Sequence, residues 1–257
     1  MIALSGCAEA LFRDLPFLDR IRAIKDLGLP AFEFWGYANK DIDAVVAMQR
    51  KMGLAVSSIS CDTGGPLVNA TNRDGFAPAC EASIKVAKRL GCATLIVTVG
   101  QEIPGASRAE QHRSVVEGIK TVVPMVEKAG VTLVVEPLNV LVNHKGYFLA
   151  TTKEGVEIVD EVGSPNVKLL YDIYHQQITE GNIIDTISAN IAKIGHFHMA
   201  DVPGRHEPGT GEINYENVFR AIAETSYAGY IGLELWPTKP ERDALAATIA
   251  WGKKYFR

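Results

Sequence analysis

GHFHMADVPGRHEPGTGEINY, residues Gly195 to Tyr215, combines an apolar strand pattern with the most polar turn of the chain. Three of the six histidines lie in it. Successive side chains of a strand point to opposite faces, so His196 and His198 project from the same face of a strand over residues 194–199. Two imidazoles on one face, followed directly by a Gly- and Pro-rich loop, indicate a site for a metal or a substrate.

Three other apolar runs end on a carboxylate. The run VTLVVE ends at Glu136, VKLLYD ends at Asp172, and IGLELW contains Glu234 near its end. A buried carboxylate without a partner costs several kcal/mol, on the order of the penalty for an unpaired buried charge. Three such carboxylates gathered around the imidazole of His198 therefore require a divalent cation.

The same order of elements, a helix, a glycine and then a short apolar strand, recurs along the whole chain. We expect strands at residues 2–5, 31–34, 54–59, 94–99, 131–136, 167–172, 194–199 and 229–235. We expect helices at residues 16–27, 42–52, 73–90, 107–128, 151–162, 183–191, 215–225 and 242–255. Eight such units predict an α/β fold, a single (β/α)8 TIM barrel. No G-x-G-x-x-G follows the first strand, which argues against a dinucleotide-binding fold.

Composition bounds the class of protein. With 257 residues and 47% hydrophobic content, we expect one domain over residues 1–257. The net charge of −4 and the scattered basic residues exclude nucleic acid as a partner. The four cysteines are far apart in sequence and are interpreted as reduced thiols. No long apolar span and no signal peptide are recognised, so we expect a cytoplasmic protein without a membrane contact.

In a TIM barrel the working face lies at the C-terminal ends of the strands. Glu136, Asp172, His198 and Glu234 end the fifth to eighth strands, and they should line one arc of the barrel mouth. Carboxylate oxygens with a single imidazole suit a hard or borderline ion. We therefore predict one divalent ion, with Mn²⁺ as the first choice and Mg²⁺ as the second.

Two further residues are predicted to contact the substrate. His175 follows Asp172 by three residues and can hydrogen-bond a substrate oxygen or a ligand carboxylate. Arg205 lies in the loop after the histidine strand, where its guanidinium could hold a carboxylate or hydroxyl. Glu33 should have a supporting or structural role, because it stands across the barrel from the arc. No role is predicted for His144, Lys145 or Glu207.

Five motifs carry a resemblance to a known family: LVVEPLN, HKGYFL, YDIYHQQ, PGRHEPGTGEINYENVFRAI and YIGLELWP. In this order they resemble the hydroxypyruvate isomerase branch of the xylose-isomerase-like sugar isomerase and epimerase barrels. The resemblance is strong from Thr132 to Pro237 and is limited to general pattern before that. It implies one Mg²⁺ or Mn²⁺ ion held by the four residues of the arc. It also implies acid and base roles for Glu136 and Glu234, and substrate contacts for His175 and Arg205.

The chain departs from this branch in its ligand set. Hydroxypyruvate isomerases tend to have Gln where this chain has His198, whereas ketose 3-epimerases have His there. Those epimerases tend to carry a further Glu shortly after EPLN, and this chain has the apolar run Val140, Leu141, Val142. The resemblance therefore leaves the substrate open.

The expected reaction is the isomerisation of a small α-hydroxycarbonyl, of the type hydroxypyruvate to tartronate semialdehyde, through a cis-enediolate. Return of the proton to the neighbouring carbon gives isomerisation, and return to the same carbon from the other face gives epimerisation. A metal-dependent lyase or decarboxylase of an oxo sugar acid and a non-catalytic partner barrel are alternatives. A DNA-repair endonuclease would need a larger multi-zinc set and a basic face. The expected partner is a small sugar or hydroxy-keto acid, and assembly into a homo-oligomer is left open.

Overall fold

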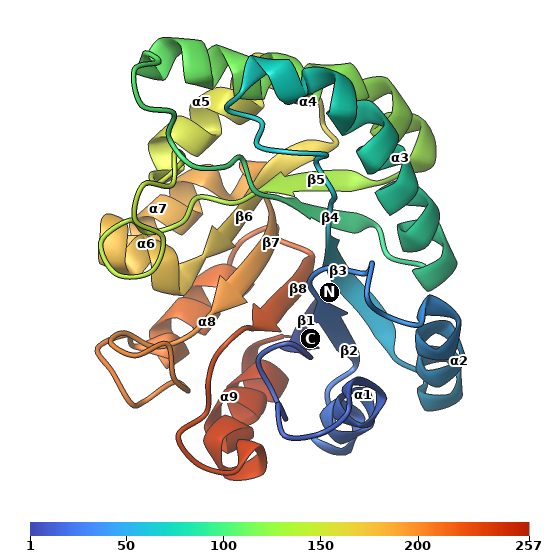
Figure 1. Cartoon of the computed structure of the whole chain (residues 1–257). Helices are drawn as coiled ribbons and strands as arrows, with labels where there is room; N and C mark the ends of the chain where they lie inside the picture. Colours follow the sequence, from blue (N-terminus) through green and yellow to red (C-terminus); the bar gives the residue numbers. More distant parts are fainter. Residues whose placement is uncertain (257) are drawn as a thin grey trace.

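The computed structural model describes residues 1–256, and a closed barrel of eight parallel strands forms its centre (Figure 1). Each strand pairs with the next along the chain, and β8 pairs with β1. The strands are β1 (Ile2–Cys7), β2 (Ala31–Phe34), β3 (Ala55–Ser60), β4 (Thr94–Val97), β5 (Thr132–Val135), β6 (Val167–Asp172), β7 (Ile194–Met199) and β8 (Gly229–Leu233). The predicted TIM barrel is confirmed, with strand ends within two residues of those expected.

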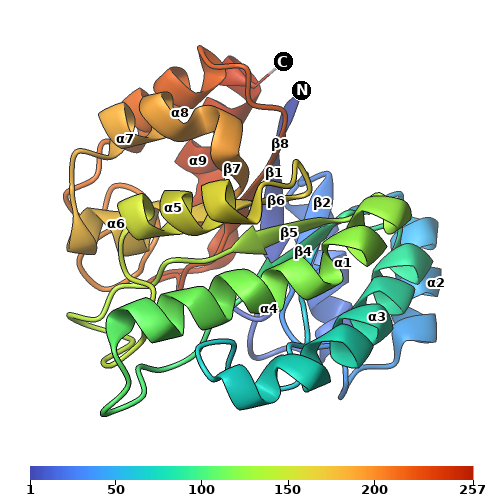
Figure 2. The same cartoon turned by 90° about the horizontal axis from the view of Figure 1, so that it is seen from above.

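The helices surround the barrel on its outer side (Figure 2). They are α1 (Phe17–Asp26), α2 (Ile42–Met52), α3 (Arg73–Leu90), α4 (Arg108–Ala129), α5 (Thr152–Val162), α6 (Ile173–Thr179), α7 (Ile183–Asn190), α8 (Tyr215–Ala223) and α9 (Glu241–Tyr255). Two short 3-10 turns are also present, η1 (Ala70–Asn72) and η2 (Ile191–Lys193). The eight expected helices are present, and α6 is an addition. A helix of only seven residues is too short to show an apolar stripe in the sequence.

Glycine marks the ends of four helices in the repeating pattern. After α2, α3, α4 and α5 the chain turns through a left-handed residue, where a side chain would be strained. The four positions have φ between 61° and 74° and are Gly53, Gly91, Gly130 and Gly163. This backbone requirement explains why a glycine separates helix from strand so regularly in the sequence.

One layer of side chains inside the barrel is polar. Ser5 and Ser57 meet through their hydroxyls at 2.6 Å, and Glu33 accepts hydrogen bonds from the hydroxyl of Ser57 at 2.9 Å and from Nε2 of His196 at 2.9 Å. A Cβ atom at Gly232 would lie 2.2 Å from Oε1 of Glu33, so only glycine leaves room for this carboxylate. The layer lies inside the barrel among β1, β2, β3, β7 and β8.

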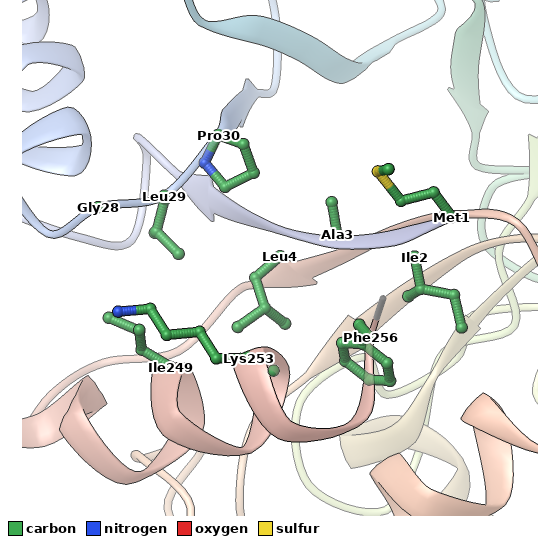
Figure 3. Close-up of a pocket in the computed structure, with 11 residues that line it drawn as sticks. Met1, Ile2, Ala3, Leu4, Gly28, Leu29, Pro30, Ile249, Lys253 and Phe256 are labelled. Carbon is green, nitrogen blue, oxygen red and sulfur yellow. The ribbon is translucent and has the colours of Figure 1, made fainter.

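An apolar groove of about 280 Å³ lies at the opposite end of the barrel, where β1 begins beside α9 (Figure 3). Its side chains are apolar apart from that of Lys253. The groove therefore offers no set of groups for acid–base or metal chemistry.

Among residues 1–256, no helix is long and apolar enough to cross a membrane. All four cysteines are buried and unpaired: Cys7, Cys61, Cys80 and Cys92.

Candidate metal centre and active site

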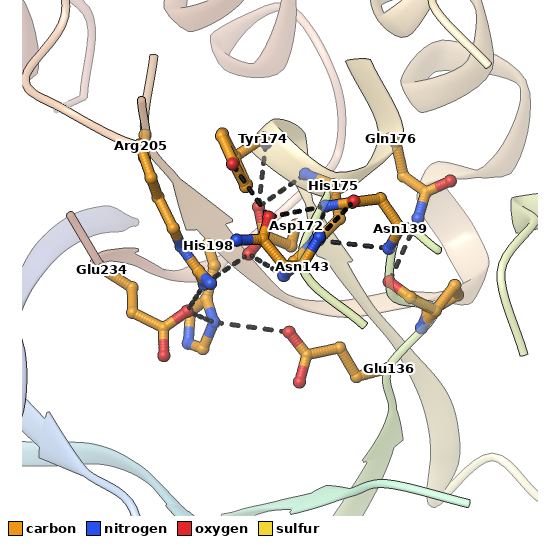
Figure 4. A network of polar contacts seen from close by, with 12 residues as sticks. Glu136, Asn139, Asn143, Asp172, Tyr174, His175, Gln176, His198, Arg205 and Glu234 are labelled. Carbon is orange, nitrogen blue, oxygen red and sulfur yellow. Dashed lines mark hydrogen bonds and ion pairs between the residues drawn. The ribbon is translucent and has the colours of Figure 1, made fainter. Parts of the chain in front are cut away.

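The four residues predicted to bind a metal lie together at the C-terminal ends of neighbouring strands (Figure 4). Glu136 directly follows β5, Asp172 ends β6, His198 lies in β7, and Glu234 directly follows β8. All four are buried, and one ligand atom from each lies within 4.8 Å of the others. Strands far apart in sequence thus bring three carboxylates and an imidazole to one point.

The ring of His198 is oriented as a ligand would be. Its Nε2 atom lies 3.0 Å from Oε1 of Glu33, and its Nδ1 atom lies 3.2 Å from Oε2 of Glu234 and 3.7 Å from Oε1 of Glu136. Within the described residues both ring nitrogens are buried, and neither has a hydrogen-bond partner. With a cation in the cluster, the carboxylate beside Nε2 would keep the ring proton on that nitrogen and leave the Nδ1 lone pair for the ion. The donor set therefore fits a divalent ion.

The charges of the cluster shift the pKa values of its members in different directions. Burial raises the pKa of Glu136 to about 7, with Glu234 and Asp172 adding to the effect and His198 opposing it. Burial also acts to raise the pKa of Glu234, but His198 and Arg205 outweigh it and lower that pKa to about 2. Two carboxylates with separated pKa values in one cavity are typical of an acid and base pair.

Burial would lower the pKa of His198, but the charges of Glu234 and Glu33 outweigh it and raise this pKa well above its ordinary value. The cluster thus carries more negative charge than its own side chains neutralise. A cation at its centre would relieve the repulsion among the carboxylates.

Glu33 contacts the cluster directly through His198. The sequence places it across the barrel from the arc, and the structure shows that its carboxylate reaches both His196 and His198 through the barrel interior. The contact of His196 at 2.9 Å is a hydrogen bond, and the contact of His198 at 3.0 Å is an ion-pair contact without hydrogen-bond geometry. These three residues therefore form a buried network below the cluster, which orients His198.

Arg205 lies directly at the cluster. Its Nη2 atom is 3.3 Å from Oδ2 of Asp172 and also bonds Oε2 of Glu234. The guanidinium stacks between the rings of Tyr174 and Trp236, with centroid distances of 5.1 Å and 4.8 Å. The structure thus brings Arg205 to the four residues, and its contact with a substrate stays a prediction.

His175 is the second predicted substrate contact, and it occupies the first turn of α6 rather than a loop. The carboxylate of Asp172 caps this helix by accepting hydrogen bonds from the backbone N–H groups of Tyr174 and His175. The Nε2 atom of His175 lies 3.5 Å from Oδ2 of Asp172. Burial lowers the pKa of His175 to about 4, so the ring is neutral near pH 7.

The cluster opens into a cavity of about 450 Å³, large enough for a small sugar or sugar acid. Several of its lining residues were not predicted from the sequence, among them Trp35, Thr98, Leu138, Asn143, His144 and Trp236. Trp35 donates a hydrogen bond from Nε1 to Oε1 of Glu234 at 2.6 Å. The position of Trp35 directly after β2 could have identified it as a cavity residue, because residues at the C-terminal ends of the strands face the barrel mouth.

Asp201 organises the loop that carries Arg205, and the sequence analysis missed it. Its Oδ1 accepts from the N–H groups of Val202 and Ile213, and its Oδ2 accepts from those of Gly209 and Gly211. The four distances lie between 2.8 and 3.0 Å. A Cβ at Gly211 would lie 2.0 Å from the carbonyl oxygen of Val202, so the loop closes only with glycine there.

The same loop gives Arg205 an unusual backbone. Arg205 adopts a left-handed conformation with φ of 61°. Its N–H donates to the carbonyl of Asp201, and its carbonyl accepts from the N–H of Trp236 at 2.8 Å. These bonds join the loop after β7 to the segment after β8, and they direct the guanidinium to the cluster.

Known proteins resemble the chain over almost its whole length. Residues 21–255 match the family described as xylose isomerase-like TIM barrel. The hydroxypyruvate isomerase of Escherichia coli (strain K12) is 31% identical over 244 residues, covering 92% of this chain and 94% of the relative. The 2-oxo-tetronate isomerase of Pectobacterium atrosepticum is 27% identical and covers 95% of each chain. A crystal structure of an AP endonuclease, family 2, from Brucella melitensis superposes with a TM-score of 0.92, at 27% identity and 99% coverage of both chains.

Proposed function

Because the chain belongs to the xylose isomerase-like TIM-barrel family and to its hydroxypyruvate isomerase branch, we propose that it is a divalent-metal-dependent isomerase of a small α-hydroxycarbonyl acid. The chain is an enzyme of the sugar isomerase and epimerase group. The reaction is of the type hydroxypyruvate to tartronate semialdehyde. The observation that supports it best is the buried cluster of Glu136, Asp172, His198 and Glu234 beside a small cavity.

These four residues would hold the ion, Mn²⁺ or Mg²⁺. When bound, a divalent ion supplies positive charge beside the substrate oxygens, which stabilises the negative charge that develops as a C–H proton leaves. The unpartnered Nδ1 atom of His198 and the excess of carboxylates support this assignment.

The protein side chains then perform the proton transfers. Glu136 and Glu234 both line the cavity. One of them removes a proton from the carbon that carries the hydroxyl and gives the cis-enediolate. The other returns a proton to the neighbouring carbon, while the hydroxyl proton passes to the former carbonyl oxygen, so that the carbonyl and the hydroxyl change places. His175 and Arg205 bind substrate oxygens. Trp35 and Trp236 line the same cavity and limit the access of water to the intermediate.

A ketose 3-epimerase is the second candidate. The imidazole in the ligand set favours it, because His198 replaces the Gln that hydroxypyruvate isomerases tend to have. Against it, the loop after β5 has Leu141 and Val142 where those epimerases tend to carry a further Glu, and both side chains are exposed. Proton return to the same carbon would need no other change in the cluster.

Other readings have less support from this chain. A lyase or decarboxylase of an oxo sugar acid would use the same cluster and differ only in its product. A non-catalytic barrel would be expected to lack one of the proposed ligands, whereas the side chains of all four proposed ligands lie together in this chain. Endonuclease activity would require binding of a polyanion, which the net charge of −4 opposes. Assembly into a homo-oligomer and a cytoplasmic location stay predictions.

Proton NMR in D2O tests the function directly. The Mg²⁺-loaded protein, which avoids paramagnetic broadening, is given hydroxypyruvate, tartronate semialdehyde, 2-oxo-tetronate and several ketoses in turn. We expect deuterium to enter hydroxypyruvate or 2-oxo-tetronate while the isomeric product appears. Deuterium only at C3 of a ketose would establish the epimerase, and no exchange with any of them would contradict the proposal.

Glu234→Gln is the matched variant for this experiment. The amide keeps the size of the side chain and removes its capacity to accept a proton from carbon. We expect turnover to fall by at least about 10³-fold while substrate binding stays measurable by calorimetry. Turnover at the wild-type rate would remove Glu234 from the acid–base pair.

A further inference from the structure

The two ring nitrogens of His175 face different surroundings (Figure 4). Nδ1 faces Asn139, which directly follows the cavity residue Leu138 in the β5–α5 loop. Two donors of Asn139 point at this nitrogen: its backbone N–H at 3.3 Å and its side-chain Nδ2 at 2.6 Å. Both side chains are completely buried, so no water competes for these contacts.

The orientation of the Asn139 amide is fixed by other contacts. Its Oδ1 atom accepts from the backbone N–H groups of Val142 at 3.0 Å and Asn143 at 3.2 Å. Backbone N–H groups only donate, so the oxygen end of the amide must face them. The NH₂ end therefore faces His175, and it also donates to Oδ1 of Asn143 at 3.1 Å.

The position of the proton on His175 follows from this geometry. A nitrogen that faces two obligate donors must be an acceptor, so Nδ1 carries no proton and the neutral ring carries it on Nε2. Nε2 is buried, has no hydrogen-bond partner within the described residues, and belongs to a side chain that lines the cavity. Oδ2 of Asp172 lies 3.5 Å from this nitrogen, beyond a good hydrogen bond, so the hydrogen on Nε2 is free to bind a substrate oxygen in the cavity.

We infer that Asn139 is a positioning residue, which holds His175 in the Nε2–H tautomer so that the neutral ring donates a hydrogen bond to a substrate oxygen. The inference rests on the proposed function for the nature of the ligand, an α-hydroxycarbonyl with oxygens on adjacent carbons. It adds that His175 is a donor and takes no part in proton transfer, because Nδ1 cannot accept a proton while it faces two donors.

Asn139→Asp tests the inference. The carboxylate can still accept from Val142 and Asn143, which keeps the turn, but it places an acceptor against Nδ1 of His175. The proton should therefore move to Nδ1, and Nε2 should become an acceptor that no longer serves a substrate oxygen. We expect kcat/KM to fall by about 10²- to 10³-fold, the range for loss of one preorganised donor.

The tautomer is measured by ¹⁵N NMR of the Mg²⁺-loaded protein labelled in its histidines, with the signal of His175 assigned by its loss in His175→Gln. The wild type should show a protonated Nε2 and an unprotonated Nδ1, and Asn139→Asp should show the reverse. Asn143→Asp is the control, because it adds the same charge to the same loop. Oδ1 of Asn143 already accepts from Tyr174 and Asn139, so His175 should keep the wild-type tautomer in this control.

Each outcome bears on the inference. A wild-type His175 protonated on Nδ1, or on both nitrogens, would overturn it even if the variant failed to fold. An unchanged tautomer or an unchanged kcat/KM in folded Asn139→Asp would also overturn it. Failure of the proposed function would appear separately, as the absence of deuterium exchange with the substrate panel, while the tautomer of the protein remained as inferred.

Discussion

The contact between Glu33 and His198 joins the polar network inside the barrel to the four side chains proposed to bind the ion. The carboxylate accepts from Ser57, Ser58 and His196, and its Oε1 atom faces Nε2 of His198 at 3.0 Å. Partners of this kind fix the ring of a metal-binding histidine and raise its basicity. We therefore expect Glu33 to affect the affinity for the ion, although it is not one of the four proposed ligands.

Replacement of Glu33 tests this role. Glu33→Gln should weaken Mn²⁺ binding by about 10- to 100-fold, because the amide is a poorer partner for Nε2 of His198. Titration calorimetry, or the electron paramagnetic resonance signal of free Mn²⁺, measures the affinity. Ser58→Ala is the control, since it removes only a 3.2 Å contact to the same carboxylate. Equal affinity of Glu33→Gln and the wild type would show that the contact does not orient the ring.

The loop between β7 and α8 carries Arg205, and its internal contacts explain why a long irregular segment can position a guanidinium. Asp201 accepts four backbone N–H groups from within the loop. Glu207 joins the loop to the segment after β8, accepting from the N–H of Thr238 at 2.9 Å and from its hydroxyl at 2.7 Å. The loop is thus fixed both by contacts within it and by contacts with the segment after β8.

The contact of Glu207 should depend on pH. Burial acts to raise the pKa of Glu207, but the two hydrogen bonds from Thr238 outweigh it and lower the pKa. A carboxyl with a lowered folded pKa stabilises the fold above its unfolded pKa, about 4.3, and loses this contribution as the pH falls through the folded pKa. Glu207→Gln should therefore lower the free energy of unfolding by about 1–2 kcal/mol at pH 7 and by less below pH 4.

Urea unfolding at pH 7 and at acid pH measures this difference. Thr238→Val is the control, because it removes the hydroxyl donor and keeps the backbone N–H. Its effect at pH 7 should be smaller than that of Glu207→Gln. A loss of stability in Glu207→Gln that stays the same or grows on acidification would contradict the assignment.

At the level of elements, the sequence predicted those helices and strands whose limits are set by nearby residues. The glycine after each of α2 to α5 and the apolar period of each helix are local features, so those elements were recognised within about two residues. Helix α6 was not, because its start depends on the side chain of Asp172 accepting two N–H groups. In the sequence Asp172 was interpreted only as a metal ligand, so its second role as the cap of α6 was not predicted.

At the level of the whole molecule, the candidate site could be predicted because the barrel makes strand ends equivalent. Glu136, Asp172 and Glu234 end their runs in the same way, and the closed barrel places such ends around one mouth. The contacts made by Glu33 and Asn139 were not predictable in this way. Glu33 reaches His198 only across the closed barrel, and Asn139 meets His175 only because the loop after β5 folds over α6.

Because the cluster is distributed over β5, β6, β7 and β8, binding of the proposed ion would require the folded barrel. The ligand residues are up to 98 positions apart, so the unfolded chain cannot present them together. An ion that binds only the folded protein stabilises it by about 2.7 kcal/mol when its concentration is 100 times the dissociation constant. For a chain of this size that corresponds to a rise in Tm of roughly 5–10 °C.

Thermal unfolding with EDTA and with excess Mn²⁺ should show this difference as a shift of a single cooperative transition. A single transition is expected because the ion would connect half of the strands of one barrel rather than a local segment. In Glu136→Gln the shift should become smaller, since one of the three carboxylates is lost. Glu207 lies outside the cluster, so Glu207→Gln should keep the full shift. Equal Tm values with EDTA and Mn²⁺ in the wild type would mean that the four buried side chains do not bind the ion.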